Sequence, residues 1–313
     1  MIQTLYEFGE TLDKKDLGET EFYDIHDFKI DDDFIYIADF KGQSVSVFEK
    51  NGTLLNISGR QGRGPGEFVQ GPRIIAPAHD QNKVYVIGTM PNFSVYDTEL
   101  NFETYEYFIR NPVSTYGLEY FDKKLFIMTT QFSEENIIIY DFETAGLENI
   151  FLNFDLEPGL LAKYTMRKVG DYWLFAWYFK NKFKVFDEDF SLVHEYSLPH
   201  LPDKADGRVN ELSMIPDEAT SYRARVYSLG SFSPYGTFFK EFLALEDNHF
   251  IVQMGTLTGG PDQAIILHLD GNILQQVQLP APGKLLGYQD GELYMLSSDG
   301  SNIVAYEFRK GYR

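Results

Sequence analysis

The chain contains no cysteine among its 313 residues, which excludes disulfide bonds, thiolate metal sites and cysteine nucleophiles. It also has no long apolar run, since no segment approaches the ~20 apolar residues that a membrane helix needs. The first residues, MIQTLYEFGETLDKK, have neither a basic region nor an apolar stretch. We therefore expect neither a transmembrane segment nor a signal segment in this chain.

Basic residues are scarce, with 27 Lys and Arg against 47 Asp and Glu and a formal net charge of −20. Such a surface repels phosphate backbones and anionic membranes, so we expect no nucleic-acid partner. The six histidines show no HxxxH or HxH spacing that would indicate zinc. Serine hydrolase elbows of the GxSxG type are missing as well. No motif therefore predicts a catalytic residue.

Aromatic residues are abundant, with 27 Phe and 21 Tyr. Flat rings pack well on the pleated surface of half-buried strands, which favours an all-β fold. The length and the 43% hydrophobic content are enough for a large core. A repeat architecture would allow this core to belong to one domain.

The stretch from Phe22 to Phe68 gives the clearest pattern. It predicts strands at Phe22–Ile30, Phe34–Asp39, Ser44–Phe48 and Thr53–Ser58. An acidic turn at 31–33 separates the first two strands, and Asn51-Gly52 precedes the last. Asn-Gly between strands is a strong hairpin signal, because both turn residues need positive φ. A glycine-rich exit, GRQGRGPGEF, follows.

Five further copies follow at the spacing of propeller blades. Their second strands read KVYVIG, KLFIMTT, YWLFAWY, HFIVQMG and ELYMLSS. The sixth copy stops after NIVAYEF, without a fourth strand. We expect Ile2–Phe8 to supply that strand and to remove an open sheet edge. The fold prediction is thus an all-β, six-bladed β-propeller of four-stranded antiparallel sheets.

The predicted domain is a single one over residues 1–313. A segment without the repeat pattern, at about 200–237, interrupts it between the fourth and fifth copies. Insertions of this kind map to face loops, often on the binding face, so we expect a lid there. The alternative is that the segment only covers a sheet edge.

The first copy carries a family resemblance. The segment IYIADFKGQSVSVFEKNGTLL, followed by GRQGRGPGEF and the proline of GPR, resembles NHL-repeat and TolB-like six-bladed β-propellers, in particular an uncharacterised bacterial extracytoplasmic family. The resemblance implies a toroid of six sheets. It also implies a binding function, without catalysis, as in most members. It also implies export, and hence a periplasmic or extracytoplasmic location.

Two conspicuous motifs are interpreted structurally. Gly59, Gly62, Gly64 and Gly66 resemble a phosphate cradle, but the Gly-Lys-Ser/Thr end and the helix of a P-loop are missing. A connector between blades explains the glycines and Pro65. The acidic residues at 31–33 lack the glycine and terminal glutamate of an EF-hand loop, so we interpret them as a solvated turn.

A further candidate site comes from aligning the six copies on their second strands. One position of the innermost strands then holds only polar or amphipathic residues: His26, Arg73, Tyr116, Tyr164, Glu241 and Lys284. Innermost strands line the channel of a propeller, so these residues are expected to form a cationic, hydrogen-bonding ring at the channel mouth. A small polar or anionic ligand, or a sugar-like one, would suit it. The alternative is a water-filled channel whose polar residues pair with each other.

We therefore predict a non-enzymatic propeller that binds a protein or a small polar or anionic ligand at the channel mouth and the lid. The alternative is a metal-dependent hydrolase or lyase with its site at the central channel. A channel calcium would need converging acidic and amide oxygens. The ring offers one acid, so no catalytic residue, metal ligand or cofactor is predicted.

Overall fold

The computed structural model describes residues 5–88, 93–107, 115–129, 137–150, 164–177, 181–199, 239–255, 262–298, 300 and 302–311. Within these ranges the strands form six four-stranded antiparallel sheets, as predicted. Two short 3-10 helices accompany them, η1 (Lys15–Gly18) and η2 (His79–Gln81). The insertion predicted at 200–237, with its lid, lies outside the described residues.

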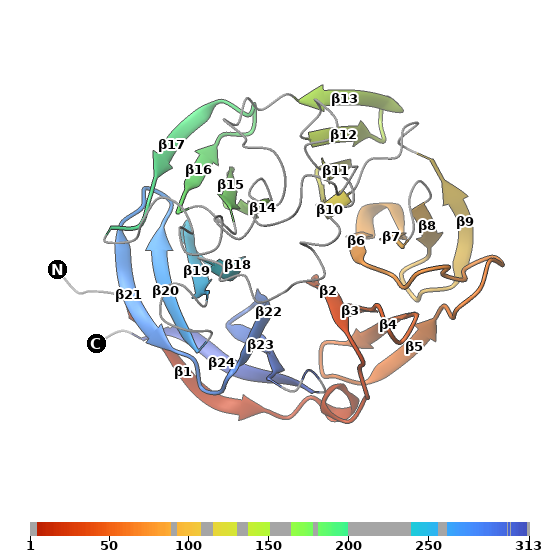
Figure 1. The fold of residues 1–313 in the computed structure, drawn as a ribbon, viewed down its shortest axis with the longest axis horizontal. Coiled ribbons are helices and arrows are strands. Elements are labelled where there is room, and N and C mark those ends of the chain that lie inside the picture. The colour runs from red at the N-terminus through yellow and green to blue at the C-terminus, as the bar shows by residue number, and fades with distance from the viewer. Residues whose placement is uncertain are drawn as a thin grey trace, which may run out of the picture. The chain divides into compact units, whose positions relative to one another are not determined.

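Each sheet is a meander of consecutive strands, apart from the one that contains the first and last strands, β1 and β24 (Figure 1). The first three sheets consist of β2 (Ile25–Ile30), β3 (Phe34–Asp39), β4 (Ser44–Glu49) and β5 (Leu54–Ser58); β6 (Ile74–Ala78), β7 (Lys83–Ile87), β8 (Phe93–Tyr96) and β9 (Phe102–Glu106); and β10 (Thr115–Phe121), β11 (Lys124–Thr129), β12 (Ile137–Asp141) and β13 (Gly146–Ile150). The next two consist of β14 (Tyr164–Val169), β15 (Tyr172–Trp177), β16 (Phe183–Phe186) and β17 (Leu192–Tyr196); and β18 (Phe239–Ala244), β19 (His249–Met254), β20 (Gln263–His268) and β21 (Ile273–Gln278). The last consists of β22 (Gly283–Gln289), β23 (Glu292–Ser297), β24 (Ile303–Gly311) and β1 (Leu5–Leu12).

The chain divides into two compact units, described separately below. The first unit comprises residues 1–151 and 280–313, and the second comprises residues 152–279. In the first unit β2 contacts both β22 and β6, and β6 contacts β10. In the second unit β14 contacts β18. The innermost strands of successive sheets are therefore neighbours within each unit.

The middle strands are buried on both faces, which explains their continuous apolar sequences. In β3, Ile35 and Ile37 pack into the core shared with the β22–β24 sheet. The alternate residues Tyr36 and Ala38 pack into the core shared with the β6–β9 sheet. Fourth strands are more exposed, and on β5 the side chain of Ile57 is 49% exposed. The hydrophobic cores of the first unit therefore lie between its sheets.

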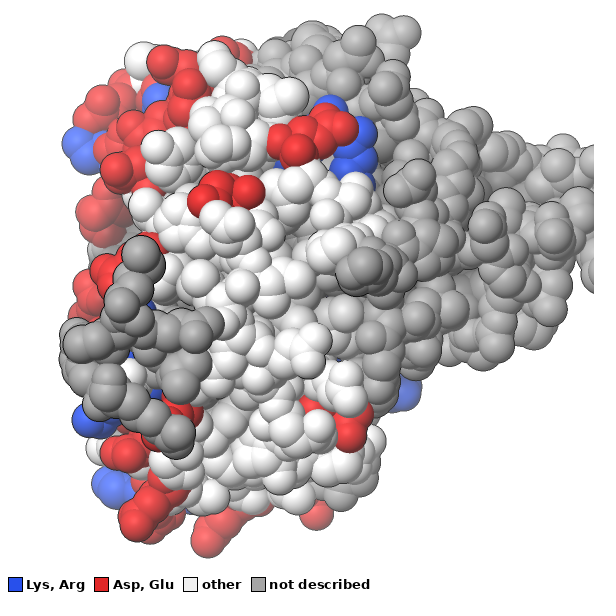
Figure 2. All heavy atoms as spheres, turned by 90° about the vertical axis from the view of Figure 1, so that its left-hand side faces the viewer, with Lys and Arg blue, Asp and Glu red and all other residues white. Residues whose placement is uncertain are grey.

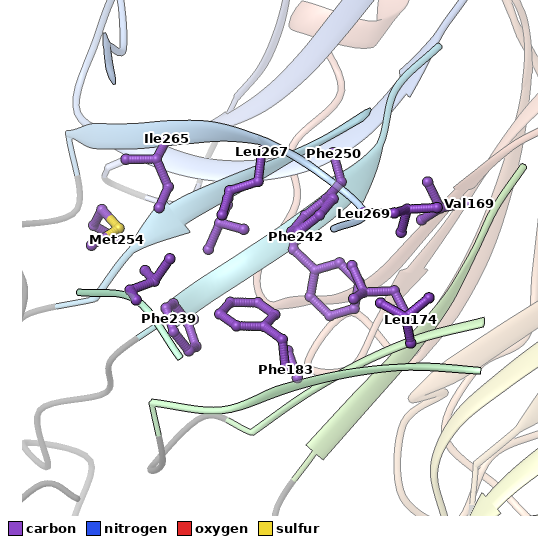
Figure 3. Packing of buried hydrophobic residues seen from close by; sticks show 14 residues of the cluster. Val169, Leu174, Phe183, Phe239, Phe242, Phe250, Met254, Ile265, Leu267 and Leu269 are labelled. Atoms are coloured by element: carbon purple, nitrogen blue, oxygen red, sulfur yellow. The ribbon is translucent and has the colours of Figure 1, made fainter. Parts of the chain in front are cut away.

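The second unit has a core of the same type, in which β14–β17 packs against β18–β21 (Figure 3). Phe183 of β16 is fully buried, and its ring centroid lies 4.7 Å from that of Phe239 at the start of β18. The ring of Tyr196 stacks on Phe183 at 5.3 Å. Burying each such side chain stabilises the fold by roughly 1.5–3 kcal/mol.

The predicted closure of the last sheet is present, with β1 antiparallel to β24. The strand lies a few residues later than the expected Ile2–Phe8, and its register is interrupted between Phe8 and Thr11. Lys14, which follows β1, donates to a carboxylate oxygen of Glu292 at 2.6 Å and to the carbonyl of Lys50 at 2.9 Å. This part-buried ammonium links the sheet formed by β1 and β22–β24 to the turn between β4 and β5 of the first sheet.

The Asn51-Gly52 hairpin forms, but with one conformational difference from the prediction. Only Gly52 has a positive φ, of 87°. The side chain of Asn51 instead accepts a hydrogen bond from the backbone N–H of Thr53 at 2.8 Å. The loop is longer than a two-residue turn, because Glu49 N–H donates to the Thr53 carbonyl at 2.9 Å. Longer hairpin loops built around a type I turn need only one left-handed residue.

Many acidic residues have a structural role in turns. In four sheets the aspartate at the end of the third strand, or just after it, accepts backbone N–H groups from the residues that follow: Asp97, Asp141, Asp187 and Asp270. Such turns pre-order the entry into the fourth strand. These bonds also hold the pKa of the Asp141 and Asp270 carboxyls below the usual range, mainly through the N–H groups of Thr144 and Asn272.

Candidate functional site

The six residues of the predicted ring are divided between the two units. His26, Arg73, Tyr116 and Lys284 belong to the first unit, and Tyr164 and Glu241 belong to the second. All lie on innermost strands except Arg73, which immediately precedes β6. The side chain of Tyr116 is outside the described part of the structure. The ring as a whole stays a prediction, and the first unit is where its members can be examined together.

Strand register corrects the alignment in the fifth sheet. In β2 the pairing with β3 skips His26, which forms a β-bulge. In β18 the pairing with β19 skips Lys240 in the same way. Lys240 is therefore the counterpart of His26, and Glu241 is the counterpart of Asp27. The turn after β18 is one residue longer than the turn after β2, which displaced the alignment by one position.

Asp27 and Glu241 are the residues that follow these bulges, and each caps its own strand. The carboxylate of Asp27 accepts the N–H of Phe28 at 3.0 Å, and that of Glu241 accepts the N–H of Phe242 at 3.1 Å. Asp27 also accepts the N–H of Ile75 on the neighbouring strand β6 at 2.9 Å.

Glu241 contacts its neighbouring strand as well, because Arg167 of β14 donates to it at 3.4 Å. The carboxylates of Asp27 and Glu241 thus connect adjacent innermost strands. Because both already accept backbone N–H groups, we assign these two residues a structural role.

A pair of the predicted residues does come together in the first unit, through a side chain that the sequence did not single out. The ring of His26 stacks on Phe40, with centroids 4.6 Å apart and an interplanar angle of 28°. The guanidinium of Arg73 lies 5.0 Å from the centroid of the same ring. Both His26 and Arg73 are exposed. We call this group the Phe40 cluster: His26, Phe40 and Arg73.

Charged groups border the Phe40 cluster. A carboxylate oxygen of Asp24 lies 3.9 Å from Nε2 of His26 and 3.4 Å from Nζ of Lys41. Arg73 makes no ion pair with any residue that the structure describes. Cation–π contact and stacking hold its guanidinium in place while leaving its N–H groups available.

The backbone around Phe40 is fixed by Asp39, whose side chain is only 3% exposed. Its carboxylate accepts the N–H groups of Tyr23 and Asp24 at 2.9 Å each, and that of Gly42 at 3.0 Å. The N–H of Phe40 in turn donates to the carbonyl of Asp24 at 2.9 Å. Asp39 therefore ties the segment before β2 to the β3–β4 turn, and so positions the aromatic platform.

Gly71 is required by close approach to the same segment. A Cβ at this position would lie 1.8 Å from the backbone oxygen of Phe40, far inside van der Waals contact. The chain leading to Arg73 can therefore pass over Phe40 only with glycine here. Arg73 is brought to the ring by this crossing.

Two other charged side chains on the innermost strands of the first unit pair with each other. Lys29 of β2 donates to Glu119 of β10 at 2.7 Å and to the carbonyl of Leu118 at 3.2 Å. Both charged side chains are less than one-fifth exposed, at 15% and 19%. This pair matches the alternative in which channel residues pair with each other.

The glycine-rich connector uses its own donors internally. The N–H of Gly62 donates to the carbonyl of Phe68 at 3.0 Å, and that of Gly64 donates to Glu67 at 2.7 Å. The N–H of Gly66 donates to the hydroxyl of Tyr105 at 3.1 Å. These groups are not available to a phosphate, so the connector interpretation is supported.

Glu67 organises this connector. The N–H of Gly64 and then the guanidinium of Arg60 hold the pKa of the Glu67 carboxyl below its usual value. Arg60 donates from Nε at 2.7 Å.

The acidic turn at 31–33 is a turn, as predicted, but it is more than a solvated one. Asp31 accepts the N–H groups of Asp33 and Phe34 at 3.0 and 2.8 Å. Its other carboxylate oxygen lies 2.8 Å from Nε2 of His79, next to the following sheet. Among the residues that the structure describes, no group of three or more His, Cys, Asp or Glu is placed to hold a metal ion.

The acidic excess is visible on the surface. Figure 2 shows separated groups of Asp and Glu, few Lys or Arg, and a broad uncharged area between them on one face. The chain has a net charge of −20, so the exposed Arg73, which has no carboxylate partner among the described residues, is a local site of positive charge.

Comparisons with known proteins agree on the fold. A structure of a candidate exported protein of Bacteroides fragilis is similar, with a TM-score of 0.66 and 14% identity over 98% of this chain and 95% of that one. A DUF4221 family member of Bacteroides vulgatus gives 0.63 and 10% over 99% and 100%. The WD40 propeller domain of Doa1 gives 0.50 and 11% over 97% of each chain. No curated protein sequence matches significantly. The DUF5128 family, described as a 6-bladed beta-propeller, matches residues 11–224, and the chain belongs to this family of six-bladed β-propellers.

Proposed function

We propose that this protein is a non-enzymatic binding propeller and that the Phe40 cluster is part of its recognition site. The observation that supports this proposal most directly is the shared contact of His26 and Arg73 with the ring of Phe40. An exposed cation, an imidazole and an aromatic ring provide charge, hydrogen bonds and a flat apolar surface. A sugar-like ligand that bears a carboxylate matches all three.

The restrained geometry also supports a binding role. Asp39 fixes the backbone on both sides of the cluster, so a ligand would meet groups that are already ordered. Preorganised groups lose less entropy on binding. Because the chain carries a net charge of −20, Arg73 would also select for an anion through local positive charge.

Titration with glucuronate, followed by NMR or calorimetry, tests the proposal. We expect saturable binding, weakened about tenfold or more by Arg73→Ala, because a charge-assisted hydrogen bond contributes roughly 1.5–3 kcal/mol. His26→Ala should weaken it less. Glucose, which lacks the carboxylate, is the ligand control, and Arg309→Ala is the charge-matched protein control. Unchanged affinity in both His26→Ala and Arg73→Ala would reject the cluster as the site.

We further propose that the chain is of the NHL-repeat or TolB-like type and acts outside the cytoplasm. The support is the GRQGRGPGEF connector and the candidate exported protein among the structurally similar chains. No helix within the described residues is long and apolar enough to cross a membrane. Fractionation of cells expressing the native gene, followed by immunodetection, tests the location.

A further inference from the structure

We propose that a second site lies beneath the glycine-rich connector of the first unit, where a cavity bordered by Arg63 binds a small, ring-sized organic carboxylate. The cavity has a volume of about 160 Å³ and is lined by Arg63, Glu67, Phe68, Val69, Gly88, Ser94 and Tyr105. None of these residues belongs to the Phe40 cluster, so the inference is independent of the proposed function.

The walls of the cavity are fixed by hydrogen bonds from the connector to β9. The hydroxyl of Tyr105 donates to the carbonyl of Gly64 at 2.8 Å and accepts the N–H of Gly66 at 3.1 Å. Phe68 is 3% exposed and packs in the core between the sheets. The cavity is therefore part of the folded connector.

The charges around the cavity favour an anionic ligand, although the carboxylate of Glu67 is part of its lining. Glu67 is already neutralised by Arg60, whose Nη2 lies 2.6 Å from its carboxylate, and by the N–H of Gly64. The side chain of Arg63 makes no ion pair or hydrogen bond with any residue that the structure describes, and it is exposed. A guanidinium offers two parallel N–H groups to a carboxylate. Arg63 is thus the group that selects the ligand.

The volume of the cavity and its apolar lining residues determine the uncharged part of the ligand. A cavity of about 150 Å³ is large enough for benzene, so one ring-sized apolar group fits. Phe68, the half-exposed Val69 and the ring of Tyr105 supply apolar contact. The N–H groups of Gly62 and Gly64 are used within the connector, which disfavours a phosphate held by the backbone. A carboxylate on an apolar ring matches this combination.

Benzoate is the probe for this site, titrated into the full chain and followed by NMR or calorimetry. We expect saturable binding that Arg63→Gln weakens by about tenfold to a hundredfold, the range of a lost charge-assisted hydrogen bond. Arg63→Lys keeps the positive charge but lacks the two parallel N–H groups of a guanidinium, so its affinity for benzoate should be intermediate. Arg309→Gln removes the same charge from an exposed site on β24 and should bind benzoate like the native protein.

Two further probes test the chemistry, with circular dichroism to verify folding of each variant. Benzamide has the ring without the charge, and inorganic phosphate has charge without a ring, so both should bind at least about tenfold more weakly than benzoate. Glucuronate binding at the Phe40 cluster should be unaffected by Arg63→Gln. Absence of benzoate binding, equal binding of benzamide or phosphate, or full affinity in folded Arg63→Gln would overturn the proposal.

Discussion

Replacing Asp39 by alanine removes the acceptor of three backbone N–H groups at a side chain that is 3% exposed. A buried donor left without a partner costs about 1–3 kcal/mol. The three costs are not additive, because all three N–H groups share one carboxylate and water can reach part of the opened segment. We therefore expect a loss of about 4 kcal/mol in the free energy of unfolding, at the upper end for single substitutions.

The assay is urea denaturation monitored by circular dichroism. Asp39→Asn separates charge from geometry, because its amide oxygen can still accept from Asp24 and Gly42 while its NH₂ group faces the N–H of Tyr23. We expect about half the loss seen for alanine. Asp33→Ala, at a carboxylate that is 68% exposed, is the matched control and should change stability by less than about 0.5 kcal/mol. An Asp39→Ala protein within about 1 kcal/mol of the native value would refute the reasoning.

Two further substitutions test the connector and the crossing. Gly71→Ala places a Cβ 1.8 Å from the oxygen of Phe40 and should lower the free energy of unfolding by about 3 kcal/mol or more. Gly18→Ala, whose Cβ would lie 4.0 Å from its nearest atom, is the control and should be near neutral. Equal melting temperatures for the two variants would contradict this expectation. The pKa of Glu67 is lowered by the N–H of Gly64, so its contribution is present above the unfolded pKa of about 4.5 and lost as the pH falls through the lower folded pKa. Glu67→Gln should therefore flatten the acid limb of the stability profile, and an unchanged limb would contradict this assignment.

The six-sheet fold could be predicted because its physical cause is local and recurs. Strands buried on both faces need continuous apolar sequence, and Tyr36 and Ile37 illustrate this by packing into different cores. The period of these runs indicated the number of blades. The closing strand could be predicted because the sixth copy lacked one, although its bounds, Leu5–Leu12, depend on side-chain packing that the pattern does not contain.

Residue positions within the candidate site were less predictable. Lys240, and not Glu241, is the counterpart of His26, because the turn at Leu245–His249 is one residue longer than the first turn. A one-residue difference in a loop leaves the apolar pattern intact but changes the position that each side chain occupies. An alignment of weakly similar repeats cannot detect such a difference in loop length.

Phe40 was missed because its role depends on three segments that meet only in the folded chain. A local signal was nevertheless present, since Asp39 at a strand end with Gly42 three residues later is typical of a side-chain-capped turn. Such a turn indicates a fixed backbone, and the residue inside it is presented in one orientation. Searching for aromatic residues within such capped turns would have found the cluster.

The pairing of β1 with β24 has a kinetic consequence. About 290 residues separate these strands, and at roughly 5–20 residues per second the ribosome needs about 15–60 s to make the partner. Throughout that time the edge of β1, with Tyr6 and Phe8 on it, has no native partner. The last sheet is therefore completed only after β24 has been synthesised, and until then the edge of β1 is exposed to misassociation with other chains and to capture by chaperones.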